Sequence, residues 1–237
     1  MTKTTLSVAS ALAFCSMSAS SAVLVAGWDA FSSGLTPSTT QEAAGITATM
    51  VNTGWSNGSS EDRGSSSDTT WGSFDGDGAA ADSAIVGTVN LTAHNGESGN
   101  TMTITITNNS SDVLNLAEFH MDALAFRPNA SRTWTLDVDG SNVYTSAAQS
   151  ITSLGTAPNA AQDQHDEYDI SLAGTTVAAD GGSVDIVMTI SGGGGNAGHH
   201  LWVDNIAVSG DFATIPEPSS ALLALMSGGL LLRRSRK

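Results

Sequence analysis

The 237-residue sequence is poor in cysteine, in basic residues and in long apolar runs. Its single cysteine, Cys15, lies in the weakly apolar stretch near the N-terminus, and the remainder of the chain contains none. A chain body without cysteine excludes thiol catalysis, disulfides and zinc sites built on thiolates. Such a body must be stabilised by its apolar core or by a bound metal ion.

Basic residues are almost absent from the middle of the chain. Between positions 23 and 215 there are 22 acidic residues and three basic ones, Arg63, Arg127 and Arg132, which gives a net charge of −19. Phosphate groups are bound by clustered lysine and arginine, so this balance argues against nucleic acid and anionic membrane as partners. Two explanations of the acidity stay open. It serves solubility in a salty medium, or some carboxylates bind Ca²⁺, a hard cation that takes oxygen ligands.

The first 22 residues have the form of a secretory signal peptide. Lys3 supplies a positive start, Leu6 to Met17 is mostly apolar or small, and Ser20-Ser21-Ala22 offers small residues for cleavage. Such a segment is removed on export and takes no part in the fold. We therefore expect the folded body to begin at Val23.

No apolar run reaches the roughly 20 residues of a typical bilayer-spanning helix. The longest, Ser219 to Leu232, has a fixed setting at the C-terminus. Pro216-Glu217-Pro218 precedes it, and a basic cluster follows, which consists of Arg233, Arg234, Arg236 and Lys237. Two prolines fix the backbone before the run, and the positive-inside rule would hold the basic cluster in the cytoplasm. An ordinary C-terminal anchor or a hydrophobic core helix is the alternative interpretation of residues 216–237.

This three-part order resembles the PEP-CTERM sorting tail of exported bacterial proteins. The resemblance covers about a tenth of the chain. It implies recognition and processing by an exosortase-type membrane enzyme, with Pro216, Glu217, Pro218, Arg233 and Arg234 as the sorting motif. It further implies transient anchoring of the C-terminal helix in the inner membrane before processing, and then a place at the cell surface or in the extracellular matrix.

Residues 23–215 are predicted to form a single all-β domain. This span is rich in Thr, Ser, Gly, Asn and Asp, a composition that favours short strands joined by turns. Alternating apolar residues, as in the runs 101–107 and 184–190, are typical of half-buried strands. About nine to eleven such strands separated by turn signals predict a β-sandwich, at this length a jelly roll.

Two segments decide details of that prediction. Val113 to Phe126 has apolar residues at helical spacing, but the all-β surroundings favour strand, bulge and strand. Asp139-Gly140 between alternating runs is a strong signal for a two-residue hairpin.

The closing strand, Leu201 to Gly210, carries a second resemblance. Its W-x-D-N-I-x-V-x-G pattern is similar to the end of many carbohydrate-binding and concanavalin-like jelly rolls. In several such modules an acidic residue of the last strand and groups near the first strand share a structural Ca²⁺. The resemblance implies Asp204 as a ligand with Asp29 as its partner. Alternatively, Asp204 and Asn205 form local hydrogen bonds to the backbone.

Three tryptophans, Trp55, Trp71 and Trp202, are candidates for stacking on sugar rings, although each also suits the core of a sandwich. Catalytic signatures are lacking: there is no nucleophile elbow, phosphate loop or dinucleotide fingerprint. The histidines are scattered without metal-ligand spacing. Glu118 and Asp122 would be a carboxylate pair to consider only if their segment were a helix.

We therefore expect a non-enzymatic, exported surface or matrix protein with a structural or adhesive role linked to exopolysaccharide. A non-catalytic carbohydrate-binding module is the alternative, and a jelly-roll glycan hydrolase or lyase is the third hypothesis. No cofactor is expected beyond a structural Ca²⁺.

Overall fold

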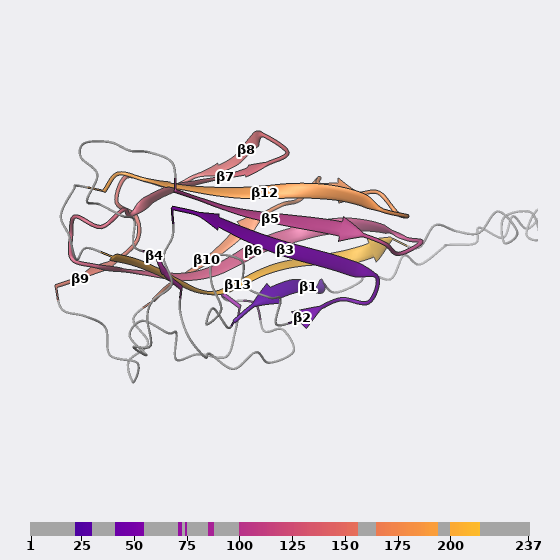
Figure 1. The fold of residues 1–237 in the computed structure, drawn as a ribbon, viewed down its shortest axis with the longest axis horizontal. Coiled ribbons are helices and arrows are strands. Elements are labelled where there is room, and N and C mark those ends of the chain that lie inside the picture. The colour runs from indigo at the N-terminus through magenta and orange to yellow at the C-terminus, as the bar shows by residue number, and fades with distance from the viewer. Residues whose placement is uncertain are drawn as a thin grey trace, which may run out of the picture.

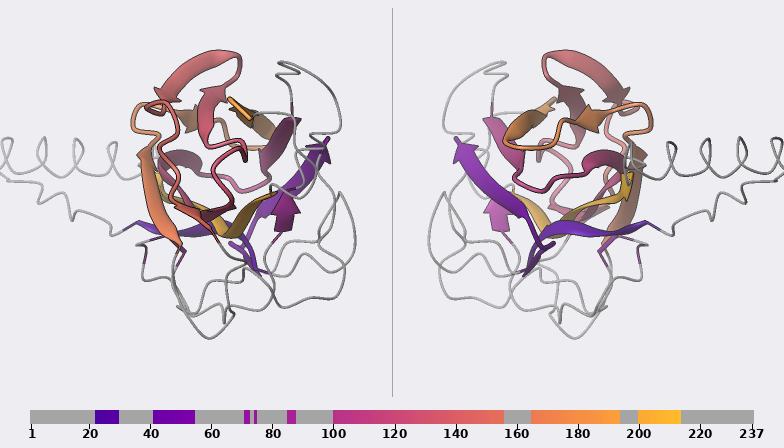
Figure 2. Two further views of the ribbon diagram at one scale, coloured as in Figure 1. Left: turned by 90° about the vertical axis from the view of Figure 1, so that its left-hand side faces the viewer. Right: turned by 90° about the vertical axis from the view of Figure 1, so that its right-hand side faces the viewer.

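The computed structural model describes residues 22–29, 41–54, 71–72, 74, 85–87, 100–155, 165–193 and 200–213. Within these residues the chain forms thirteen strands and no helix. The strands make two sheets that lie as two layers (Figure 1). Seen along the long axis, the two layers lie face to face (Figure 2). The apolar core between them contains buried residues of both sheets, such as Ile104 and Phe119. The predicted β-sandwich is confirmed; the number of strands is somewhat higher than expected because three of them have only two residues.

The five-stranded sheet has the order β3-β5-β12-β7-β8, and every pairing in it is antiparallel. Its strands are β3 (Ile46–Thr53), β5 (Asn100–Asn108), β7 (Thr133–Val138), β8 (Ser141–Thr145) and β12 (Gly182–Ser191). Burial alternates along β3, β5 and β12, and most of the inward residues are apolar; the exceptions at the strand ends include buried Asn52 and Asn108, and Val51 is an outward apolar residue. Since side chains of a strand alternate between the two faces, one face is core and the other is open to solvent.

The larger sheet has the order β10-β6-β13-β1-β2, with three short strands attached. Its strands are β1 (Val23–Trp28), β2 (Gln41–Glu42), β4 (Ile85–Gly87), β6 (Val113–Phe126), β9 (Ser153–Leu154), β10 (Asp166–Ser171), β11 (Thr176–Val177) and β13 (His200–Ala213). All pairings are antiparallel except the short one between β6 and β9. In β6 and β13 buried residues follow one another, which shows that both faces of this sheet are covered there.

The segment 113–126 is one long strand, β6, and the helical alternative is wrong. The expected bulge is present, because Ser209 pairs with Glu118 and Gly210 pairs with Leu116, which leaves Ala117 extra. Because of the bulge, two inward-facing residues, Leu116 and Phe119, are three positions apart instead of two. The apolar residues of this strand therefore show a spacing like that of a helix. Without a helix, the pairing of Glu118 with Asp122 on one helical turn is also lost.

The hairpin predicted at Asp139-Gly140 is confirmed. Val138 pairs directly with Ser141, and the two residues between them have positive φ angles of 47° and 77°. A two-residue turn with positive φ at both positions matches the twist of the flanking strands. Glycine accepts that backbone at no steric cost, and aspartate tolerates it better than most residues.

Both predicted terminal segments lie outside the described residues, so the signal peptide 1–22 (all but its last residue) and the sorting segment 216–237 stay predictions. Among the residues that are described, no helix is long and apolar enough to cross a membrane.

The assignment of faces in the five-stranded sheet gives a direct test on β5. Ile104 is 1% exposed in the core, while its neighbour Thr103 points outward. We expect Ile104→Ala to lower the free energy of unfolding by about 2–5 kcal/mol and Thr103→Ala to lower it by less than about 1 kcal/mol. Urea unfolding followed by tryptophan fluorescence measures both, and equal losses would mean that the faces are assigned wrongly.

Candidate functional site

A short turn covers part of the outer face of the larger sheet. Trp71, Gly72 and Phe74 form it, and we call these three residues the aromatic strap. Trp71 and Phe74 exchange two backbone hydrogen bonds, of 3.0 and 2.8 Å. The Trp71 side chain is fully buried and packs with Ala207 of β13 in a cluster separate from the main core.

Two glycines allow the strap to lie this close to the sheet. A Cβ atom on Gly27 of β1 would come within 2.6 Å of the Trp71 ring, which is closer than two carbons can approach. Gly72 has a φ of +53°, and a Cβ there would lie 2.9 Å from the Asp169 carboxylate. A side chain at either position would therefore displace the strap.

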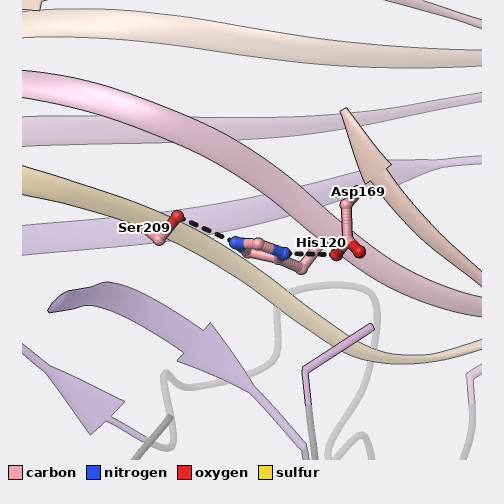
Figure 3. A network of polar contacts seen from close by, with 3 residues as sticks. All are labelled: His120, Asp169 and Ser209. Atoms are coloured by element: carbon pink, nitrogen blue, oxygen red, sulfur yellow. Dashed lines mark hydrogen bonds and ion pairs between the residues drawn. The ribbon is translucent and has the colours of Figure 1, made fainter. Parts of the chain in front are cut away.

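Beneath the strap, three polar side chains from three adjacent strands form a hydrogen-bonded chain (Figure 3). His120 Nδ1 lies 2.6 Å from Asp169 Oδ1, and His120 Nε2 lies 2.8 Å from Ser209 Oγ. The Phe74 ring stacks on the imidazole with a centroid distance of 4.9 Å. His120 and Ser209 are fully buried, and the Asp169 side chain is partly exposed.

This order of contacts is that of a Ser-His-Asp triad, but the surroundings do not suit catalysis. Ser209 Oγ is covered, so a substrate carbonyl cannot reach it with the strap in place. A triad also needs donors for the developing oxyanion, whereas Ser209 lies within β13 between β1 and β6. The hydrogen bonds among His120, Asp169 and Ser209 instead satisfy polar groups that would be costly to bury without partners.

A second group of polar side chains follows on the same face of β6 and β13. Asp122 stands opposite Asp204 in the ladder, and the Asn205 side-chain amide donates to Asp122 Oδ2 at 2.9 Å. The Asn205 backbone N–H donates to Asp204 Oδ1 at 3.0 Å. Trp28 pairs with Ile206, which brings Asp29 next to Asn205. All four residues are at most 3% exposed.

The structure thus places the two predicted calcium ligands, Asp29 and Asp204, on neighbouring strands at one level of the sheet. The local hydrogen bond expected as the alternative is also present, from Asn205 to Asp204. Asn205 Oδ1 is buried and accepts no hydrogen bond from the described residues. The carboxylate and amide oxygens of these side chains are the kind of ligand that Ca²⁺ prefers. No three acidic or imidazole side chains of the described residues converge on one point, so a bound ion would also need amide or backbone oxygens.

The predicted sugar-stacking tryptophans are not presented to solvent where they are described. Trp71 is fully buried under the strap, and Trp202 is 3% exposed in β13. Trp55 lies outside the described residues. Stacking by Trp71 or Trp202 would require their cover to open, and their role in sugar binding stays a prediction.

The sequence alone gives no sign that His120, Asp169 and Ser209 are joined by hydrogen bonds. The partners are 49 and 89 positions apart in sequence, so no local spacing signals them. Only the pairing of β6 with β10 and β13 brings them together. Asp122, 83 positions from Asn205 in sequence, was missed as a neighbour of Asp204 and Asn205 for the same reason.

The tyrosine nearest this region does not offer acid-base chemistry. Burial, with the charge of Asp166 as a second cause, raises the pKa of Tyr168 to about 12. Its ring meets Trp134 of the opposite sheet edge-on, with centroids 5.3 Å apart. The phenol is therefore neutral at ordinary pH and belongs to the packing between the sheets.

The outer face of the five-stranded sheet is open and polar. Threonine fills most of its outward positions, which include Thr47, Thr49, Thr53, Thr101, Thr103, Thr105, Thr107, Thr133, Thr135, Thr145 and Thr189. Asp185 accepts a hydrogen bond from Thr105 at 2.7 Å, and Asp137 accepts one from Asn142 at 3.0 Å. Of the described residues, none that points outward from these five strands is aromatic or basic.

Comparison with known proteins gives no family. No protein-family model and no curated protein matches the chain. Three solved structures share distant likeness. A family 35 carbohydrate-binding module from an environmental isolate is 13% identical over 74% of this chain and 96% of that one, with a TM-score of 0.30. The Podospora anserina GH26-CBM35 β-(1,4)-mannanase is 10% identical over 74% of this chain and 29% of that one, with a TM-score of 0.29. A family two carbohydrate esterase from Clostridium thermocellum, in complex with cellohexaose, is 11% identical over 51% of this chain and 28% of that one, with a TM-score of 0.24.

The fit between the strap and β1 can be tested at Gly27. We expect Gly27→Ala to lower the free energy of unfolding by about 1–3 kcal/mol, because the new methyl group overlaps the Trp71 ring. Gly155→Ala is the matched control, since nothing lies within 4 Å of that position, and it should stay within about 0.5 kcal/mol. In a Trp71→Ala background the same Gly27→Ala change should cost little, so the double-mutant cycle should give a coupling energy similar in size to the loss in the single variant. A Gly27→Ala protein as stable as wild type would mean that Trp71 does not pack on β1.

Proposed function

We propose that this chain is an exported, non-catalytic polysaccharide-binding protein of the cell surface or extracellular matrix. The observation that carries the proposal is the open face of the five-stranded sheet, which presents threonine hydroxyls, carboxylates and amides to solvent. Sugars are recognised by hydrogen bonds from such groups. The resemblance of the closing strand, Leu201 to Gly210, to carbohydrate-binding jelly rolls supports the same function.

Burial supports the non-catalytic part of the proposal. The one described group with the order of a hydrolase triad, that of Ser209, His120 and Asp169, has its nucleophile fully covered. Asp122 is fully buried and accepts a hydrogen bond from Asn205. A glycan hydrolase needs two carboxyl groups facing a substrate, and Asp122 does not meet that requirement.

Export is proposed from the two ends of the sequence. A signal peptide would direct the chain across the inner membrane, and the PEP-CTERM-like tail would tether it there until an exosortase-type enzyme processes it. The extracellular polysaccharide is then the partner, and the adhesive role predicted from the tail becomes the consequence of binding it.

Binding is tested by electrophoresis of the full chain through native gels that contain soluble polysaccharides. We expect retarded migration in gels with at least one uncharged polysaccharide, compared with a gel without it. A non-binding protein of similar size and charge is the control for sieving. Unchanged migration in a broad panel of neutral and charged polysaccharides, with the chain folded, would overturn the proposal.

We further propose that Asp204 and Asp29, together with the side-chain oxygen of Asn205 and backbone oxygens, hold a structural Ca²⁺. Neighbouring buried carboxylates repel one another unless a cation or a proton intervenes. The buried Oδ1 of Asn205, which accepts no hydrogen bond from the described residues, provides a neutral oxygen ligand. The ion would tie the end of β1 to β13 at the level where β13 departs from regular pairing.

Thermal unfolding of the full chain tests this site. A metal that binds only the native state raises the melting temperature by mass action. We expect millimolar Ca²⁺ to raise Tm by several degrees relative to the protein in chelator. At a free Ca²⁺ concentration of 100 to 1,000 times Kd, binding stabilises the native state by about 3–4 kcal/mol. Asp204→Asn should remove the rise, and Asp211→Asn, in the same strand but partly exposed, should keep it. Equal melting of the wild-type chain in calcium and in chelator would exclude the site.

A further inference from the structure

Five threonines form one line across the whole five-stranded sheet. The strand registers pair Thr53 with Thr101, Thr101 with Thr189, Thr189 with Thr135 and Thr135 with Thr145. Each of the five strands therefore contributes one threonine at the same level. We call these five residues the threonine line.

The hydroxyl groups of the threonine line are available to a ligand. Thr53 and Thr145 are exposed, and the other three are partly exposed. Thr145 Oγ1 donates to Asn142 at 3.2 Å. For the remaining four, no hydrogen bond of the hydroxyl is found with the described residues, although elsewhere on this face Thr105 and Thr47 hydroxyls are engaged. Each hydroxyl can both donate and accept, as a sugar hydroxyl does.

The spacing of the line suits a linear polymer. Neighbouring strands are about 4.8 Å apart, a distance comparable to the length of one pyranose ring. A sugar chain that runs across the strands can thus meet one threonine for each ring. Because adjacent strands are rotated by roughly 20–25°, the line is twisted and cannot match a flat crystal surface. A single soluble chain can follow that twist.

The charges on the face limit the polymer further. Asp137 and Asp185 are its described ionic side chains, both acidic, and no described outward residue is basic. The body as a whole is also strongly acidic. Uronic or sulfated chains would be repelled. Stacking on sugar rings is excluded on the described face because it has no aromatic side chain, so hydrogen bonds must provide the recognition.

We propose that the threonine line binds a single chain of an uncharged linear polysaccharide, oriented across the strands. This inference rests on the proposed polysaccharide-binding function and names its site and ligand class. It assigns the binding to hydroxyl groups on the sheet face rather than to the tryptophans Trp55, Trp71 and Trp202.

The test compares two substitutions at two positions. In Thr101→Val with Thr189→Val the hydroxyls are lost, while the shape and the preference for strand remain. In Thr101→Ser with Thr189→Ser the hydroxyls remain and a methyl group is lost from each. Affinity for soluble neutral polysaccharides is measured by gel retardation and calorimetry on the full chain, with circular dichroism to confirm folding. Two ligand hydrogen bonds contribute a factor of about ten in affinity.

We expect the valine variant to bind about tenfold more weakly and the serine variant to bind within about threefold of wild type. Thr107→Val, on β5 but away from the line, should bind as wild type does. Full binding by the valine variant would overturn the inference and leave the proposed function standing. Equal binding of an acidic polysaccharide would overturn it as well. Failure of the wild-type chain to bind any polysaccharide would overturn both.

Discussion

Contact between the apolar faces of the two sheets is the interaction on which the rest of this structure depends. Trp134 of the five-stranded sheet is fully buried in this contact. Its ring meets Phe119 and Tyr168 of the opposite sheet at centroid distances of 6.4 and 5.3 Å, and Tyr144 of its own sheet at 4.6 Å. Because strand side chains alternate with a period of two, burying Trp134 and its neighbours fixes which residues point outward. The threonine face is therefore a consequence of the core.

The larger sheet departs from this simple division, because its outer face is also covered. The aromatic strap packs on β1 and β13, and the polar side chains below it are held by hydrogen bonds to one another. Burial at low dielectric makes each of these bonds stronger and each unpaired group more costly. Neither ring nitrogen of His120 is left unpaired, since one is hydrogen-bonded to Asp169 and the other to Ser209. A polar group in this setting specifies the position of the strap; it does not need to be reactive to be retained.

The sequence predicted the strands well wherever one face is buried and the other is open. In β5 and β12 the alternation is local, so reading residues two apart was sufficient to assign both faces. In β6 both faces are covered and a bulge shifts the pattern, so apolar residues appear at helical spacing and a helix was a reasonable competitor. Composition and the surrounding strands, rather than periodicity, favoured the correct prediction there.

Sites were predicted less well than strands, because they depend on register between distant segments. The resemblance implies Asp204 and Asp29 as ligands, whereas Asp122 becomes visible as their neighbour only when β6 and β13 are paired. The threonine line has the same origin. Thr53, Thr101 and Thr189 are unremarkable in sequence, since threonine is common in strands, and only four successive registers place them in line.

The two outer faces differ in how freely they can change. On the larger sheet, Trp71 lies against a glycine that has no room for a methyl group, and Asp122 holds Asn205, so a substitution there disturbs several strands together. On the five-stranded sheet an outward threonine packs against few neighbours, and its exchange leaves the core untouched. Residues that contribute little to stability can vary to suit a ligand without unfolding the protein. The open face is therefore where a sandwich of this kind can acquire or alter binding, while the covered face keeps the strands in register.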